Sequence, residues 1–154
     1  MNIFEYFYEE ERDIEEKLVE TTNNYEIWTR EQVFDHVKVV CDEIMGHLKK
    51  QTSLLLNNLN EQKASLNEIM VEAQKDHRLV EDEIGQLTQV HVDEPNYQES
   101  LRNLLKVLEQ HIAFSRRLYA KVKETATPQE LELLNSRFNN VLLHSTDFNS
   151  LQAS

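Results

Sequence analysis

Residues 107–119, VLEQHIAFSRRLY, carry the pattern that decides the fold and also raise the question of function. The positions three, four or seven residues from His111 are occupied by Leu104, Leu108, Ser115 and Leu118. On a helix these residues share one face, so the spacing predicts a helix whose mostly apolar stripe packs against other helices. The imidazole of His111 and the hydroxyl of Ser115 interrupt that stripe. They are either polar groups tolerated in a core or parts of a site.

The same alternation of four-residue and three-residue steps recurs along the chain. It predicts four long helices, over roughly residues 2–22, 29–57, 64–90 and 97–125. With only two Gly and two Pro in 154 residues, the chain has few of the residues that sheets and their turns need. The predicted fold is therefore all-α, an antiparallel four-helix bundle with up-down-up-down order.

The C-terminal part of the chain predicts one further element. Residues 127–130, TPQE, have the form of a capping box with proline at the first helical position. A short fifth helix that contains Leu131, Leu134 and Phe138 should follow, and the tail, about residues 145–154, is expected to fray. Because the length suits one core and is too short for two, residues 1–154 are predicted to form a single domain.

Composition excludes several functional classes. A formal net charge of −12 repels phosphate backbones and anionic membrane surfaces, so we expect neither nucleic acid nor membrane as a partner. No apolar run approaches the ~20 residues of a membrane span, and residues 1–13 show no secretion signal. The single cysteine, Cys41, excludes an internal disulfide and fits a reducing compartment. The predicted location is cytoplasmic, and the sequence identifies no protein partner.

Each predicted long helix carries one polar side chain in the middle of its apolar stripe. These residues are Glu11, His47, His77 and His111. At ~1.5 Å per residue in antiparallel neighbours, the three histidines reach similar depths, and we expect the four side chains to converge within ~10 Å. Buried imidazoles cannot all be protonated, and each ring nitrogen needs a partner. A metal ion satisfies several of them at once, whereas a core histidine satisfied by hydrogen bonds is the alternative.

The polar positions also suggest that the two halves of the chain are copies of one another. The two polar residues of the first half, Glu11 and His47, are 36 residues apart, and those of the second half, His77 and His111, are 34 residues apart. The stretches concerned are IFEYFYEEERDIEEKL (3–18), IMGHLKKQ (44–51), DHRLVEDEI (76–84) and LEQHIAFSRRLYAKVKETATPQELELLNSRF (108–138). Together they resemble the hemerythrin-like proteins, the HHE cation-binding domains. The resemblance implies a four-helix bundle made of two hairpin copies around a non-haem di-iron centre. In that family each hairpin supplies a His on its first helix and an H-x-x-x-E pair on its second.

The departures from the family pattern change the expected site. His47, His77 and His111 match it, but Glu11 stands where a His is expected, and Gln51 and Ser115 stand where two bridging carboxylates are expected. Since neither neutral residue can hold two irons together, we expect no intact di-iron centre. The prediction is a reduced site for one Fe or Zn ion. Its predicted ligands are His47, His77, His111 and Glu11, with Glu81, one turn after His77, as a substitute.

The predicted role is to bind or sense that cation. No positioned acid, base or nucleophile is visible in the sequence, so the chain is predicted not to be an enzyme. One alternative is a metal-free descendant of the family that serves as an interaction or structural module. A second alternative is an enzyme that uses non-haem iron for oxygen chemistry.

Overall fold

The structure, a computed structural model, describes residues 2–60 and 62–143 of the chain. These residues form helices and turns and no strand, so the all-α class is confirmed for the part described. The predicted fraying of residues 145–154 lies outside the described residues. The α-helices are α1 (Ile3–Asn23), α2 (Arg30–Lys50), α3 (Ala64–Gln89), α4 (Tyr97–Thr125) and α5 (Pro128–Leu143).

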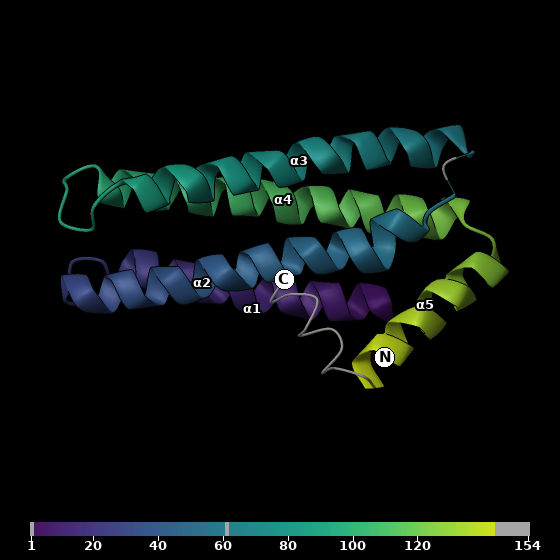
Figure 1. Cartoon of the computed structure of the whole chain (residues 1–154), viewed down its shortest axis with the longest axis horizontal. Coiled ribbons are helices and arrows are strands. Elements are labelled where there is room, and N and C mark those ends of the chain that lie inside the picture. The colour runs from purple at the N-terminus through teal and green to yellow at the C-terminus, as the bar shows by residue number, and fades with distance from the viewer. Residues whose placement is uncertain (1, 61, 144–154) are drawn as a thin grey trace.

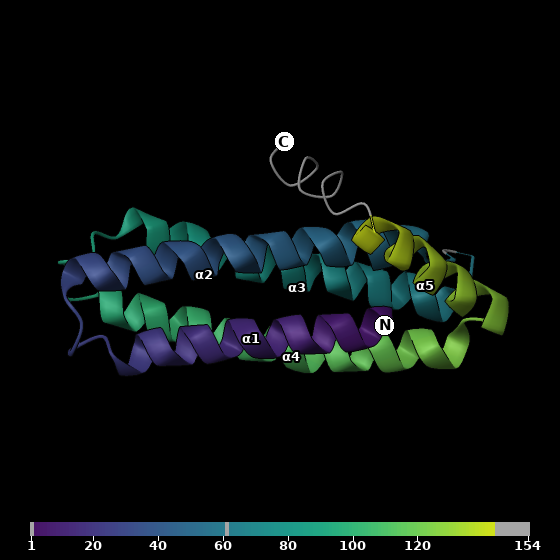
Figure 2. The same ribbon diagram turned by 90° about the horizontal axis from the view of Figure 1, so that it is seen from below.

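The long helices α1 to α4 lie side by side along the long axis of the molecule (Figures 1 and 2). The colour gradient in Figure 1 shows that successive long helices run in opposite directions. Helix α3 packs most extensively against α4, α1 contacts both α2 and α4, and α2 contacts α3. Helix α5 lies obliquely across one end, where it contacts α1. Among the described residues, no helix combines the length and the apolar character needed to cross a membrane.

Side-chain caps fix where three helices begin. The side chain of Asn2 accepts a hydrogen bond from the backbone of Phe4 at the start of α1. Thr29 and Gln32 form a reciprocal capping box at the start of α2. Thr127 and Glu130 do the same at α5, which begins at Pro128 as the sequence predicted. Each cap satisfies backbone donors that the first turn of a helix leaves without partners.

The predicted helix over residues 29–57 is three elements in the structure. The α-helical part ends at Lys50, a π-helical turn spans Gln51–Leu55 (η1), and a 3-10 turn spans Leu56–Asn58 (η2). Leu54, Leu55 and Leu56 remain buried through both turns. Because the apolar pattern continues while the number of residues per turn changes, spacing alone could not reveal this change of helix type.

The core consists of two apolar clusters separated by a polar layer. Cluster 1 contains the buried apolar residues of four helices: Ile14 and Leu18 of α1, those of α2 from Val33 to Leu48, Val80, Ile84 and Leu87 of α3, and those of α4 from Tyr97 to Ile112. Cluster 2 contains Ile3, Phe4, Phe7, residues 54–56, Leu59, Leu66, Ala73, Leu134, Phe138 and four residues of α4, which are Phe114, Leu118, Tyr119 and Val122. On each long helix the predicted polar residue falls where one cluster gives way to the other. The four therefore lie at one level, inside the protein.

Candidate metal centre

The structure brings the four predicted polar side chains together in this layer. Glu11, His47 and His111 are at most 2% exposed, and His77 is 7% exposed. The ring centroids of His47 and His77 lie 5.4 and 5.6 Å from that of His111. Ligand-capable atoms of Glu11, His47 and His111 all lie within 4.8 Å of one another, and those of Asp76, His77 and His111 form a second such group.

Two atoms at the centre of the layer have no hydrogen-bond partner. They are Oε2 of Glu11 and Nε2 of His47, which lie 3.5 Å apart. Glu11 Oε2 lies 3.6 Å from Nε2 of His111 as well. These separations are too long for good hydrogen bonds. They are close to the ~3.3 Å between neighbouring ligand atoms of a tetrahedral site with metal–ligand bonds of ~2.0–2.1 Å. Glu11 Oε2 is thus spaced from each of the two imidazole nitrogens as neighbouring ligands of one small cation would be.

Carboxylates behind two of the histidines orient these rings. Glu10 Oε1 lies 2.7 Å from Nδ1 of His47, and Asp76 Oδ2 contacts Nδ1 of His111. Because an ionised carboxylate can only accept, each Nδ1 carries the hydrogen and each Nε2 faces the centre of the layer. A carboxylate behind a histidine is the arrangement that orients histidine ligands in metal proteins.

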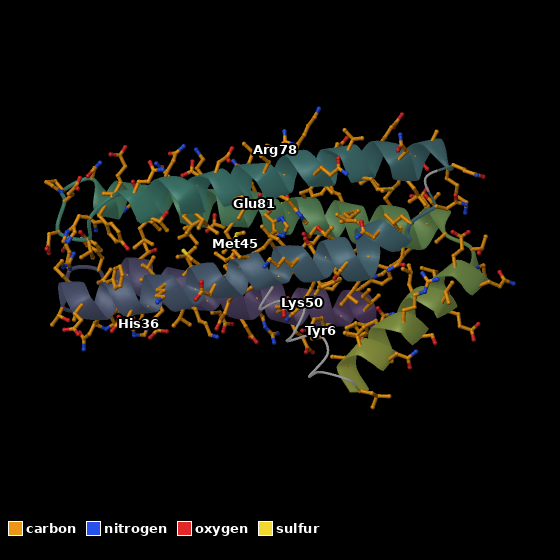
Figure 3. The ribbon with its side chains drawn as sticks, in the orientation of Figure 1. Tyr6, His36, Met45, Lys50, Arg78 and Glu81 are labelled. Atoms are coloured by element: carbon orange, nitrogen blue, oxygen red, sulfur yellow. The ribbon has the colours of Figure 1, made fainter. Side chains whose placement is uncertain are left out.

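Glu10 also connects the layer to the protein surface. Its Oε2 accepts from Lys50 Nζ at 2.5 Å and from the hydroxyl of Tyr6 at 3.0 Å. Figure 3 shows Tyr6 and Lys50 next to one another, on the side of the molecule formed by α1 and α2. A cleft of about 480 Å³ lies on that side, and its lining includes Tyr6, Glu10, Gly46 and Lys50. The Glu10 carboxylate that orients His47 therefore also lines a cleft at the protein surface.

The charges around the histidines shift their pKa values in opposite directions. Burial alone would lower the pKa of His47, but the carboxylates of Glu10 and Glu11 outweigh burial and raise it above its ordinary value. The same interaction with His47, together with Lys50, lowers the pKa of Glu10 in spite of its burial. Burial, and after it the neighbouring His111, lower the pKa of His77 to about 4. A proton and a cation would thus compete for His47, while His77 is held neutral.

A chain of neutral groups borders the other side of the layer. Nε2 of His77 lies 2.9 Å from Oε1 of Gln51, and the Gln51 amide nitrogen donates to the hydroxyls of Tyr119 at 2.5 Å and Ser115 at 3.1 Å. Tyr119 in turn donates to Oε1 of Glu11 at 3.2 Å. Burial, followed by the Glu11 carboxylate, raises the pKa of Tyr119, so the phenol keeps its hydrogen.

This chain reaches Nε2 of His111 through the Ser115 hydroxyl at 3.4 Å, but the histidine that it holds most closely is His77. Its Nε2 donates to Gln51, and its Nδ1 lies 3.5 Å from the hydroxyl of Thr52. Its Nε2 can become a metal ligand only if the ring changes tautomer and gives up the bond to Gln51. Glu11, His47 and His111 therefore need no rearrangement to act as ligands, whereas His77 must first change its tautomer.

Glu81 does not join the site, contrary to the prediction that it could replace a missing ligand. Its side chain is exposed, and it belongs to neither group of ligand-capable residues. The reason lies in the helix geometry, because the interior stripe of α3 continues from His77 to Val80, three residues on. Glu81 is ~100° round the helix from Val80, at the exposed edge of the stripe.

Sequence reasoning missed Glu10, Asp76 and Tyr119 as functional residues. Glu10 and Asp76 directly precede Glu11 and His77, so each occupies the same place in its half of the repeat. An acidic residue before the stripe residue in both halves was the available signal. Tyr119 lies four residues after Ser115, one helical turn further along the face of His111.

No family model, no curated protein and no solved structure matches the chain. The arrangement of the residues in the polar layer is therefore the basis for the function proposed below.

Proposed function

We propose that this chain is a hemerythrin-like domain, an antiparallel four-helix bundle whose reduced site binds a single divalent cation, Zn²⁺ or Fe²⁺. One observation carries the proposal: Glu11 Oε2 and His47 Nε2 are buried, have no hydrogen-bond partner and lie 3.5 Å apart. Leaving a polar group buried and unsatisfied costs about 1–3 kcal/mol. A cation bound between these atoms removes that cost for both.

The ligands in the proposed site are Glu11 Oε2, His47 Nε2 and His111 Nε2. A fourth position is open to His77, after its change of tautomer, or to water. Three or four imidazole and carboxylate ligands suit Zn²⁺ and Fe²⁺. Glu10 and Asp76 support the assignment, because they already orient two of the rings in the way that metal ligands require.

A di-iron centre does not fit these residues. The family's bridging positions hold Gln51 and Ser115, which are neutral and hydrogen-bonded to each other at 3.1 Å. Two iron ions there would lack the negative charges that hold such a pair together.

The proposed role is to bind or sense the cation, without turnover. Each of the four central side chains is at most 7% exposed, which leaves a substrate little access to a bound ion. With His77 as the fourth ligand the coordination sphere would be closed, which is typical of metal sites that stabilise a structure.

One observation favours the alternative of a metal-free interaction or structural module. The chain of hydrogen bonds from His77 through Gln51 to Ser115 and Tyr119 is complete without an ion. A protonated His47 between Glu10 and Glu11 would neutralise the remaining charge. In that case the layer is a polar core network, and the domain acts through its surface.

Metal analysis separates the two functions. Protein purified without a histidine tag, then stripped with a chelator, would be titrated with Zn²⁺ in air and with Fe²⁺ under argon, with calorimetry as the readout. We expect one ion per chain, and loss of binding in Glu11→Gln and His47→Gln. His36→Gln is the matched control, because His36 is exposed on α2 and stacks on Trp28. Wild-type protein that binds neither ion, or a control that loses as much binding as the site variants, would refute the metal site.

A further inference from the structure

We propose that Tyr119 is a positioning residue that makes Glu11 bind the cation through one oxygen only. This inference rests on the proposed function, and it adds a specificity: the site should favour cations that accept four ligands, such as Zn²⁺, over cations that need six or more oxygen atoms. The residue that sets this preference touches the carboxylate ligand and not the cation.

The two oxygens of the Glu11 carboxylate have different surroundings. The Tyr119 hydroxyl donates to Oε1 at 3.2 Å, whereas Oε2 has no partner and faces Nε2 of His47 and of His111. The bond from Tyr119 occupies one lone pair of Oε1 and draws electron density from it, which makes Oε1 the weaker of the two ligand atoms. Glu11 is thus prepared as a one-oxygen ligand before any cation arrives.

The direction of this hydrogen bond is fixed by the next residue in the chain. The Gln51 amide nitrogen donates to the Tyr119 hydroxyl at 2.5 Å, so a lone pair of the phenol oxygen is occupied there. The single phenol hydrogen is then directed to Glu11. With the Gln51 amide turned round, its oxygen would take the Tyr119 hydrogen and leave Glu11 Oε1 without a donor, whereas the present orientation satisfies His77, Tyr119 and Glu11 together.

Aromatic packing holds the Tyr119 ring in place. Its centroid lies 5.6 Å from that of Phe4, 5.9 Å from that of Phe7 in a stacked pair, and 5.2 Å from that of Tyr8 at nearly a right angle. Tyr119 itself is 0% exposed. With three rings of α1 around it, the phenol of α4 cannot move away from Glu11, which is on α1 as well.

The preference for four ligands follows from this arrangement. Zn²⁺ takes four ligands in a tetrahedron, of which the protein supplies three or four. Ca²⁺ takes six to eight oxygens and often both oxygens of one carboxylate. With Tyr119 present, Glu11 offers one oxygen. Without the hydroxyl, Oε1 is released and can either chelate or turn the carboxylate away from the histidines.

The experiment compares Tyr119→Phe with wild type by using Co²⁺ as a coloured probe and Zn²⁺ as the competing ion. We expect wild type to give the strong visible band of four-coordinate Co²⁺. Tyr119→Phe should give the weaker band of a higher coordination number and bind both ions about 10- to 100-fold less tightly. Tyr97→Phe is the control, because Tyr97 is a 3% exposed tyrosine of α4 in the other apolar cluster. It should match wild type in both measurements.

A second measurement uses wild type alone and does not depend on how the variant folds. In the infrared difference spectrum between Zn²⁺-loaded and metal-free protein, a one-oxygen carboxylate ligand gives a wide separation of its two stretching bands. A narrow separation, characteristic of chelation, would overturn the inference. So would a Tyr119→Phe protein with the affinity and band of wild type, or a Tyr97→Phe protein with the same losses. Wild type that binds neither Co²⁺ nor Zn²⁺ would overturn the metal site itself, and this inference with it.

Discussion

Two histidines of the polar layer are each held by a carboxylate from the helix that precedes theirs in the chain. Glu10 of α1 binds His47 of α2, and Asp76 of α3 binds His111 of α4. Both carboxylates directly precede the residue that their own helix contributes to the layer. The sequence repeat is thus also a repeat of hydrogen bonds. In each half, the first helix contributes one residue to the layer, and the carboxylate just before that residue orients the imidazole of the second helix.

The first residue-scale prediction concerns Glu10. Glu10→Gln keeps an oxygen that can accept from His47 but removes the charge that makes Nε2 a strong ligand. We expect Zn²⁺ affinity to fall about 10- to 100-fold, as in other metal sites that lose an orienting partner. Glu9→Gln is the control, because Glu9 is an exposed neighbour on α1. Calorimetric titration measures both variants, and equal affinities in Glu10→Gln and wild type would contradict the prediction.

A second residue-scale prediction concerns acid stability without metal. The pKa of His77 is lowered from 6.5 to about 4 in the folded protein. Below pH 6.5 the unfolded chain therefore binds a proton that the folded protein refuses, so stability falls as the pH falls to about 4. The full loss from this group is about 3 kcal/mol. The raised pKa of His47 acts in the opposite direction, since its contribution is present at low pH and is lost as the pH rises through its folded pKa.

Comparison with His77→Gln isolates the His77 contribution. Glutamine can still donate to Gln51 but does not titrate. In urea unfolding with a chelator present, the free energy of unfolding of wild type should decrease more between pH 6.5 and 4 than that of the variant. Parallel curves for the two proteins would mean that His77 is not held neutral.

At the scale of single elements, the sequence allowed some features to be predicted and concealed others for physical reasons. The start of α5 at Pro128 could be predicted, because a capping box is a local pattern. The buried positions of Glu11 and His111 followed from helix periodicity. The π turn at Gln51 and the contacts of Tyr119 could not be predicted, since they depend on how helices are rotated against one another. Glu81 was predicted as a substitute ligand because it lies one turn after His77, but it falls at the exposed edge of the buried stripe.

The element-scale prediction concerns the capping box of α2. Thr29 is exposed, and its side chain accepts from the backbone of Gln32. Thr29→Ala should lower the free energy of unfolding by about 1 kcal/mol, and the thermal midpoint by roughly 2–4 °C. Thr88→Ala is the control, because Thr88 is exposed and its hydroxyl donates to a helix carbonyl near the end of α3. A midpoint for Thr29→Ala that does not differ from that of Thr88→Ala would show that the cap is not needed.

At the scale of the whole molecule, the polar layer divides what could have been one continuous core. Cluster 1 and cluster 2 lie on either side of it along all four long helices. Buried charged groups in such a layer cost stability unless they are fully paired, and replacing them with apolar residues is often neutral or stabilising. In the proposed function, the bound cation would supply the pairing that these buried groups require.

The prediction at this scale places the ligand set of the hemerythrin-like proteins on the present backbone. Glu11→His, Gln51→Glu and Ser115→Glu would be combined in one variant. Gln51→Glu changes little volume, but it replaces the donor to Tyr119 with a carboxylate that can only accept. Ser115→Glu adds volume at a position that is 0% exposed, where overpacking costs about 1–3 kcal/mol. Without metal the variant should therefore unfold at a lower temperature than wild type.

Iron should reverse that deficit, because an ion that binds only the folded protein stabilises it by mass action. At a free concentration 100 times the Kd, the gain is about 2.7 kcal/mol for each site. Thermal midpoints of wild type and the triple variant, each with and without Fe²⁺ under argon, measure the effect. We expect iron to raise the variant's midpoint more than that of wild type, with two irons bound per variant chain. If iron raises neither midpoint, and the variant takes up no more iron than wild type, then Glu11, His47, His77 and His111 are a polar core network and not a metal site.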